Sequence, residues 1–302
     1  MKKIFLTITA IWCTGFNLCA QQTDSNGKMQ LIKSLEQTIS RYKATVGLAV
    51  YEQQTGDTFS INNHIAFATQ SVYKFPLALA VLSRVESGKI SLQQKVFLSK
   101  EMLDRFSWSP LKKQNPGSNF YMSVDSLLMY MITYSDNLSC DLLFQLLGGT
   151  QAVDAFIRNK GFNDIHIKFT EAEVGAKPQR MYENTSSPVA MTRLLEAFHE
   201  RKILNEANTR YLLNFMINDS TSHMRLLGQL PDSIKAAHKT GTGSWNDTLI
   251  GACNDVGIIY LPGKGHVTIS VFVMNANENY ENTEKLIAIL AKDIYDYYRR
   301  KN

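Results

Sequence analysis

The chain has 302 residues and a formal net charge of +5, with 44% hydrophobic and 20% charged residues. This length can bury a sizeable core in one large domain or two moderate ones. The Lys and Arg residues are scattered rather than clustered, which argues against nucleic acid or a polybasic membrane surface as a partner.

The first 20 residues predict a secretory signal peptide. Two lysines precede a mostly apolar run, and Ala20 then precedes a polar stretch, the order typical of a cleavable leader. The apolar run is short for a membrane span. Cleavage after Ala20 would release residues 21–302 into the periplasm without a membrane attachment, and Cys19 leaves a lipoprotein as the alternative.

The remaining chain predicts strands at both ends and helices between them. Apolar spacing predicts helices over about 29–39, 72–85, 123–133, 137–147, 150–160, 189–199, 206–217 and 283–299. Apolar and β-branched runs predict strands over 45–51, 58–62, 234–242, 255–261 and 267–274.

This order predicts an α/β protein of the α+β type. An antiparallel sheet would be built from N- and C-terminal segments, with flanking helices and an inserted all-helical lobe. We expect a single catalytic domain over 21–302, in which an α/β lobe spans about 28–66 and 217–302 and a helical lobe spans about 67–216. A cleft between the two lobes is the natural place for a site.

Two cysteines, Cys140 and Cys253, remain once the leader is removed, and each lies in an apolar segment. One disulfide or two buried free thiols would fit, and the free thiols are favoured. The histidines are dispersed, and no Cys/His spacing is typical of a metal site. We therefore expect neither a metal nor a cofactor.

Three short motifs carry residues suited to serine acyl transfer. The S-x-x-K pattern occurs at Ser40–Lys43, Ser71–Lys74 and Ser109–Lys112. Ser71 is favoured because it is predicted to open a helix, with Lys74 one turn later on the same face. Backbone N–H groups at a helix start can stabilise an oxyanion. The alternative is an ordinary capping serine followed by a solvated lysine.

The other two motifs are Ser135-Asp136-Asn137, between predicted helices, and Lys239-Thr240-Gly241, on a predicted strand. The first could be a helix cap, and the second a strand end with turn residues. A lysine with neighbouring hydroxyls would also hold a carboxylate, and a strand glycine lets another backbone or a ligand approach closely.

Taken together, the order and spacing of these motifs resemble those of class A β-lactamases, for which they are a signature. Glu171 lies where that family keeps its deacylating glutamate, and 170–188 is loop-like, as that family's Ω-loop is. Glu173 is the weaker rival. Details such as Ala237-His238-Lys239-Thr240-Gly241-Thr242 are similar to the extended-spectrum PER/VEB branch.

The resemblance implies roles for each motif residue. Ser71 would attack the lactam carbonyl, activated by Lys74, by Glu171 through a water, or by both. Ser135 would pass a proton to the departing nitrogen, and Glu171 would activate the deacylating water. The backbone N–H groups of Ser71 and Thr242 would form the oxyanion hole. The residues expected to bind substrate are Asn137, Lys239, Thr240, Gly241, Thr242, Trp108 and Arg225, the last from a neighbouring helix.

Several residues depart from the common family pattern. Gly175 stands where the family commonly has an asparagine beside the water, and Asp141 replaces an asparagine beneath the loop. His238, beside the motif lysine, has no acidic partner at a recognisable spacing and is interpreted as structural.

The resemblance implies a monomer that hydrolyses a small β-lactam and thereby confers antibiotic resistance. A penicillin-binding DD-peptidase, a non-hydrolytic β-lactam sensor and a serine glutaminase are the alternatives.

Overall fold

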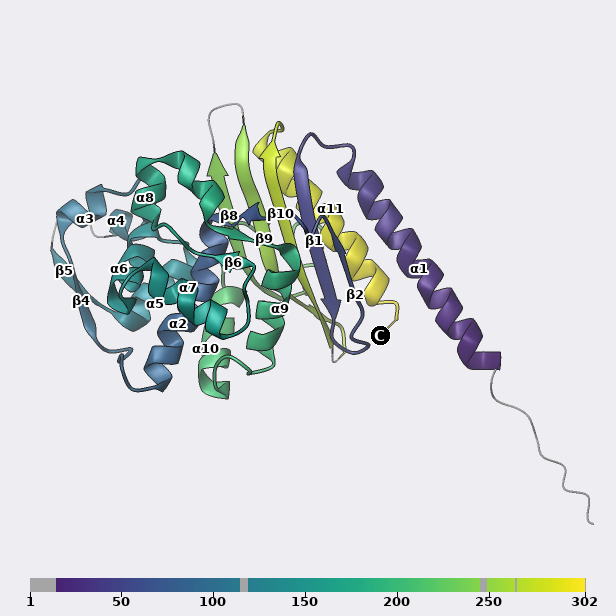
Figure 1. Ribbon diagram of the computed structural model, residues 1–302, viewed down its shortest axis with the longest axis horizontal. Helices are drawn as coiled ribbons and strands as arrows, with labels where there is room; N and C mark the ends of the chain where they lie inside the picture. The colour runs from purple at the N-terminus through teal and green to yellow at the C-terminus, as the bar shows by residue number, and fades with distance from the viewer. Residues whose placement is uncertain (1–14, 115–118, 245–248, 264, 302) are drawn as a thin grey trace, which may run out of the picture.

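Figure 1 shows a computed structural model, which describes residues 15–114, 119–244, 249–263 and 265–301. Its centre is a five-stranded antiparallel sheet with the strand order β2-β1-β10-β9-β8. The N-terminal hairpin therefore joins the C-terminal strands through the β1–β10 pair. The strands are β1 (Thr45–Glu52), β2 (Thr58–Ile61), β8 (Ala236–Ser244), β9 (Ile250–Leu261) and β10 (Gly265–Ala276).

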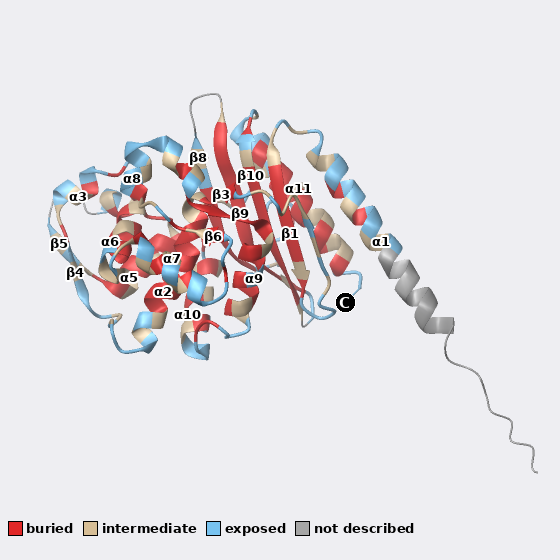
Figure 2. Ribbon diagram, in the orientation of Figure 1, coloured by how far each residue is buried: buried red, intermediate tan, exposed pale blue. Residues whose placement is uncertain are grey.

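Both faces of this sheet are covered. Helices α1 (Gly15–Ile39) and α11 (Tyr280–Tyr298) lie against one face, and α9 (Pro188–His199) and the helical lobe lie against the other (Figure 1). The central strands are consequently buried along most of their length, as Figure 2 shows. Burial on both faces explains why most residues of β9 and β10 are apolar.

The helical lobe is organised around α2 (Lys74–Glu86). Every residue from Lys74 to Leu82 is buried, so this helix has no solvent-facing side in its first two turns. A lysine at its first position is therefore forced into the interior. The neighbouring helices are α3 (Lys100–Asp104), α4 (Pro110–Gln114), α5 (Val124–Thr133), α6 (Asn137–Leu147), α7 (Thr150–Asn159) and α10 (Glu206–Ile217).

Five very short strands complete the described fold. They form a three-stranded sheet, β3 (Phe67–Ala68), β7 (Thr185–Ser186) and β6 (Ile165–His166), and a hairpin, β4 (Lys95–Leu98) with β5 (Phe120–Ser123). The sequence did not predict these strands because segments of two to four residues carry almost no periodic signal.

Two local predictions are wrong. Ser71 does not open α2; it lies in a 3-10 turn, η1 (Gln70–Tyr73), and α2 begins at Lys74. The segment 170–188, predicted as a loop, contains α8 (Glu171–Ala176) and a second 3-10 turn, η2 (Pro178–Glu183). A capping box between Thr170 and Glu173 supplies the start of α8.

The predicted leader falls mostly outside the described residues, which begin at position 15. In the described part of the chain, no helix has the length and apolar character needed to span a membrane. Cys140 and Cys253 are buried free thiols, which confirms that interpretation over a disulfide. The architecture as a whole confirms the predicted fold class.

Candidate active site

A cavity of about 510 Å³ lies between the helical lobe and β8. Its lining combines residues from the three motifs with residues from the segment before β8 and from α11: Ser71, Trp108, Ser135, Asn137, Glu171, Thr221, Arg225, Thr240, Thr242, Gly243, Ser244, Tyr280 and Glu284. Eight of the predicted site residues therefore meet here. The remaining three, Lys74, Lys239 and Gly241, are in the neighbouring walls rather than in the lining.

The turn that carries Ser71 is tied to the sheet. Asn254 of β9 donates its side-chain amide to the carbonyl oxygens of Ala68 and Thr69, at 2.8 and 3.1 Å. Gly241 of β8 passes so close that a methyl group there would lie 2.4 Å from the Thr69 carbonyl oxygen. Gln70, directly before Ser71, has φ +46°, a strained conformation for a residue with a side chain. The surrounding packing thus fixes the position of η1, the turn that carries Ser71.

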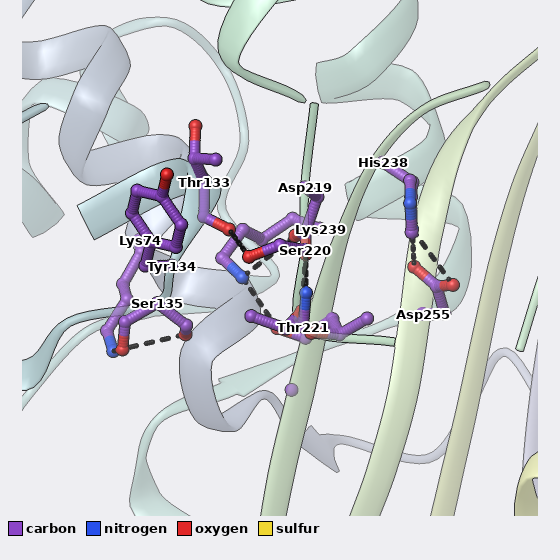
Figure 3. Close-up of polar contacts among 12 residues, drawn as sticks. Lys74, Thr133, Tyr134, Ser135, Asp219, Ser220, Thr221, His238, Lys239 and Asp255 are labelled. Carbon is purple, nitrogen blue, oxygen red and sulfur yellow. Dashed lines mark hydrogen bonds and ion pairs between the residues drawn. The ribbon is translucent and has the colours of Figure 1, made fainter. Parts of the chain in front are cut away.

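Lys74 is the hub of the polar contacts on the helical side. Its Nζ donates to the Ser135 carbonyl oxygen at 2.7 Å, to Ser135 Oγ at 3.4 Å and to Asn137 Oδ1 at 2.6 Å. Nζ also lies 3.1 Å from Glu171 Oε1, an ion pair that does not have hydrogen-bond geometry. One fully buried ammonium therefore contacts the Ser135-Asp136-Asn137 motif and Glu171. Figure 3 shows its contact with Ser135.

Ser135 occupies a strained turn between α5 and α6, with φ +55°. The next residue, Asp136, caps α6 by accepting the Ser139 N–H at 2.8 Å. Its second oxygen accepts the Ser109 hydroxyl at 2.7 Å and the Leu111 N–H at 3.0 Å. Asp136 thus fixes the turn that presents Ser135. Ser109, from another S-x-x-K sequence, therefore has a structural contact with Asp136 and does not line the cavity.

Glu171 begins α8 and is held by Asp141 of α6. The Asp141 carboxylate accepts the backbone N–H groups of Glu171 and Ala172 at 2.8 and 2.9 Å. Burial raises the pKa of Asp141 to about 7, with the nearby Glu171 charge adding to the rise and the two backbone donors opposing it. The Oε1 atom of Glu171 has no hydrogen-bonding partner among the described residues.

Gly175 lies in α8 and lines an adjoining cavity of about 710 Å³ that also contains Glu171 and Asn137. No described atom comes within 4 Å of the place that a Cβ would take. The position that lacks the family's usual side chain is therefore open space next to the glutamate.

The opposite wall, formed by β8 and the segment before it, is called the β8 wall. It presents hydroxyl groups to the cavity, and its charged side chains are buried behind them. Lys239 is fully buried, and its Nζ lies 3.2 Å from Asp219 Oδ2. Asp219 also accepts the Thr221 N–H at 2.7 Å, and the Thr221 hydroxyl bonds both Asp219 and Thr240 Oγ1. Figure 3 shows Asp219 and Thr221, from the segment before β8, beside Lys239 of β8 and on the other side from Lys74 and Ser135.

The Lys239–Asp219 pair is electrostatically coupled. Burial lowers the pKa of Lys239, although the Asp219 charge opposes the change. Burial alone would raise the pKa of Asp219, but the charges of Lys239 and His238 outweigh it and lower that pKa. The paired Lys239 and Asp219 side chains lie directly behind the Thr221 and Thr240 hydroxyls.

Arg225 is also buried and fully engaged. Its guanidinium donates to Thr242 Oγ1 at 2.7 Å, to the Gly241 and Asn254 carbonyl oxygens at 3.2 and 2.9 Å, and to Glu284 Oε1 at 3.1 Å. The expectation that it comes from a helix is wrong: it lies in bends between α10 and β8. Arg225 nevertheless lines the cavity beside Thr242.

His238 has an acidic partner that no sequence motif indicated. Its Nδ1 lies 3.0 Å from Asp255 Oδ1, on the neighbouring strand β9. Burial would lower the pKa of His238, but Asp255 outweighs it and the pKa is raised. Alternation along β8 sends His238 and Lys239 to opposite faces, and the His238–Asp255 pair lies apart from Lys74 and Ser135 in Figure 3. This geometry supports the interpretation that His238 has a structural role.

Trp108 forms an exposed aromatic side of the cavity, with 51% of its surface accessible. Its indole Nε1 donates to the Tyr134 carbonyl oxygen at 3.4 Å, which connects it to the turn that carries Ser135.

Five residues of this region were not singled out from the sequence: Asp219, Thr221, Asn254, Tyr280 and Glu284. Each reaches the site through a fold contact, such as strand register or the approach of α11, and not through a motif. In the residues that the structure describes, no group of three or more His, Cys, Asp or Glu could hold a metal ion.

Comparisons with known proteins agree with this geometry. Residues 30–298 match the family described as “Beta-lactamase enzyme family”. The chain is 36% identical to β-lactamase VEB-1 of Pseudomonas aeruginosa, over 100% of this chain and 99% of that protein. It is 33% identical to the extended-spectrum β-lactamase PER-1 of P. aeruginosa, over 92% and 91%.

A solved structure gives the same result. The crystal structure of a representative class A β-lactamase from Bacteroides cellulosilyticus aligns with a TM-score of 0.86 at 30% identity, covering 91% of this chain and 99% of that one. These matches confirm the resemblance that the motifs indicated. The chain belongs to the β-lactamase enzyme family, among its class A serine enzymes.

Proposed function

We propose that this protein hydrolyses the amide bond of penicillins and cephalosporins through an acyl-enzyme on Ser71 and thereby confers resistance to them. The observation that carries the proposal is the buried Lys74 ammonium, which contacts Ser135, Asn137 and Glu171 around one cavity that also contains Ser71. A nucleophile, a proton carrier and a general base are the parts that two-step acyl transfer needs.

In the acylation step, Ser71 Oγ attacks the lactam carbonyl carbon and loses its proton either to Lys74 in its neutral amine form, which then returns a proton through Ser135, or to Glu171 through a water. The carbonyl oxygen gains negative charge, and the backbone N–H groups of Ser71 and Thr242 are the proposed donors to it. The C–N bond then breaks, and Ser135 delivers a proton to the departing nitrogen. The contact of Ser135 Oγ with Lys74 Nζ at 3.4 Å supports this relay.

The β8 wall is proposed to orient the substrate carboxylate. Thr240 and Thr242 supply hydroxyl donors, and the positive charges of Lys239 and Arg225 lie immediately behind them. Asn137 and Trp108 would contact the acylamide group from the helical side. Gly241 contributes because it permits the close approach of β8 to the turn that carries Ser71.

In the deacylation step, Glu171 takes a proton from a water molecule that attacks the ester carbon, and Ser71 leaves with a proton restored. The position of Glu171 supports this role because the residue lines the cavity, and its Oε1, although paired with Lys74, makes no hydrogen bond to any described residue. The open space at Gly175 leaves room for that water. Deacylation is what separates a hydrolase from a penicillin-binding DD-peptidase or sensor that stays acylated.

We further propose that residues 21–302 act as a single-domain monomer in the periplasm after the leader is removed. The two lobes share the cavity, so neither would be active alone. Size-exclusion chromatography with light scattering would test the monomer, and N-terminal sequencing of secreted protein would test cleavage after Ala20.

One experiment tests the function. Purified protein is mixed with a chromogenic cephalosporin, turnover is followed, and the protein mass is measured during and after the reaction. Many turnovers per enzyme with the free mass restored would support hydrolysis. A stoichiometric adduct that persists on Ser71 would contradict it. A Ser71→Ala variant should show neither turnover nor adduct.

A further inference from the structure

Two residues near the start of α11 line the active-site cavity and have no role in the mechanism above. Tyr280 and Glu284 are four residues apart, so they lie on the same face of the helix. Both line the same cavity as Ser71 and Thr240. This pair therefore faces the place where a substrate would lie.

Tyr280 offers an aromatic ring held at its tip. Its hydroxyl lies 2.5 Å from Ser244 Oγ at the end of β8, and 39% of the residue remains accessible. A ring anchored in this way keeps a constant orientation while much of its surface stays available. Aromatic faces attract organic cations through the negative centre of the ring.

Glu284 offers an unshared carboxylate oxygen. Its Oε1 accepts the Ser222 hydroxyl at 3.0 Å and the Arg225 Nε–H at 3.1 Å, whereas Oε2 has no hydrogen-bonding partner among the described residues. The Arg225 guanidinium is in turn directed to Thr242 and two backbone carbonyl oxygens. Glu284 thus brings a carboxylate to the cavity wall one helical turn from Tyr280.

The chemistry of a cephalosporin brings one substituent to this pair. Its C3 substituent is carried by the carbon next to the one that bears the carboxylate. A carboxylate held at Thr240 and Thr242 would direct that substituent along the wall formed by Arg225 and its neighbours on α11. Building on the proposed function, we propose that Tyr280 and Glu284 form a subsite for cationic aromatic groups at C3, such as pyridinium.

A matched pair of substrates tests this subsite. Cephaloridine and cephalothin carry the same thienylacetamido side chain and differ at C3, where the first has a pyridinium group and the second a neutral acetoxy group. The measured quantity is the ratio of kcat/KM for cephaloridine to kcat/KM for cephalothin. Tyr280→Leu should lower this ratio about two- to fivefold, the size of a cation–π contact at an exposed site. Tyr280→Phe keeps the ring but loses its anchor to Ser244, so the ratio should fall less than in Tyr280→Leu.

The charge of the subsite has its own control. Glu284→Gln should also lower the ratio, whereas Glu281→Gln, the same change at an exposed neighbour outside the cavity lining, should leave it unchanged. Added salt should lower the ratio in the wild type more than in Glu284→Gln, because it screens the carboxylate. Ratios unchanged in both Tyr280→Leu and Glu284→Gln would overturn the subsite while leaving the hydrolase intact. A wild type that hydrolyses neither compound would instead overturn the proposed function.

Discussion

The two walls of the cavity handle charge in different ways. On the helical wall, the Lys74 ammonium touches Ser135, Asn137 and Glu171 directly, and three of these four residues line the cavity. On the β8 wall, Lys239 is buried against Asp219, and the cavity meets the Thr221 and Thr240 hydroxyls instead. Proton transfer needs groups in contact with reacting atoms, whereas binding an anion needs donors backed by positive charge.

The largest effect should come from removing the charge at the centre of the helical wall. Lys74→Met deletes the ammonium that contacts three other site residues, so kcat/KM should fall about 100- to 10,000-fold. Steady-state kinetics with a cephalosporin would measure it. Lys43→Met changes an exposed lysine from another S-x-x-K sequence and should keep full activity. Equal activity in Lys74→Met and Lys43→Met would contradict the proposal that the helical wall carries out proton transfer.

The β8 wall should respond in stability as well as in activity. Asp219→Asn leaves the Lys239 ammonium buried without its counter-charge, which should cost about 3–5 kcal/mol of unfolding free energy near pH 7. Burial already lowers the pKa of Lys239 below its usual 10.5, and losing Asp219 lowers it further.

The sign of the pH dependence follows from that shift. A depressed pKa means that the folded protein binds fewer protons than the unfolded chain, so stability rises with pH. The deficit of Asp219→Asn should therefore shrink as the pH approaches 10.5. Denaturant unfolding at pH 7 and pH 10 would measure it, and a deficit that grows with pH would contradict the pairing.

A smaller loss of stability is expected where β8 contacts the turn that carries Ser71. A Gly241→Ala methyl group would lie 2.4 Å from the Thr69 carbonyl oxygen, and backbone must move to admit it. The expected cost is about 1–3 kcal/mol, with a loss of activity because the Ser71 turn shifts. Gly175→Ala, where no atom lies within 4 Å, should be at least as stable as the wild type. Thermal unfolding of the two variants would separate these outcomes.

Motifs identified much of the helical wall from the sequence, because Ser71, Lys74 and Ser135 lie in short local patterns. Order and spacing added Glu171. The β8 wall was less accessible: its motif named Lys239 and Thr240, but Asp219 and Thr221 reach them only through folding. The His238–Asp255 pair likewise depends on strand register, in which Gly257 is opposite His238 and Asp255 lies two residues away. This register could not be predicted from the distance between the two residues in the sequence.

The smallest effect concerns Asp141, which supports Glu171 from beneath. Burial raises its pKa to about 7, so the folded state binds a proton that the unfolded chain releases near pH 3.8. Its contribution to stability is full below pH 3.8 and is lost as the pH rises through about 7. Asp141→Asn removes this titration. Relative to wild type, the variant should therefore gain about 1–2 kcal/mol between pH 6 and pH 8, as measured by denaturant unfolding. A constant difference would contradict the assignment.

The most direct test of the account is the fate of the acyl-enzyme when the general base is removed. Glu171→Gln keeps the shape of the side chain but cannot take the proton from water, so acylation should continue while deacylation slows. Intact-protein mass spectrometry after mixing with cephalothin should show an accumulated adduct on Ser71. Glu173→Gln, two residues along α8, should return to the free mass as the wild type does. Normal turnover without an adduct in Glu171→Gln would contradict the central claim.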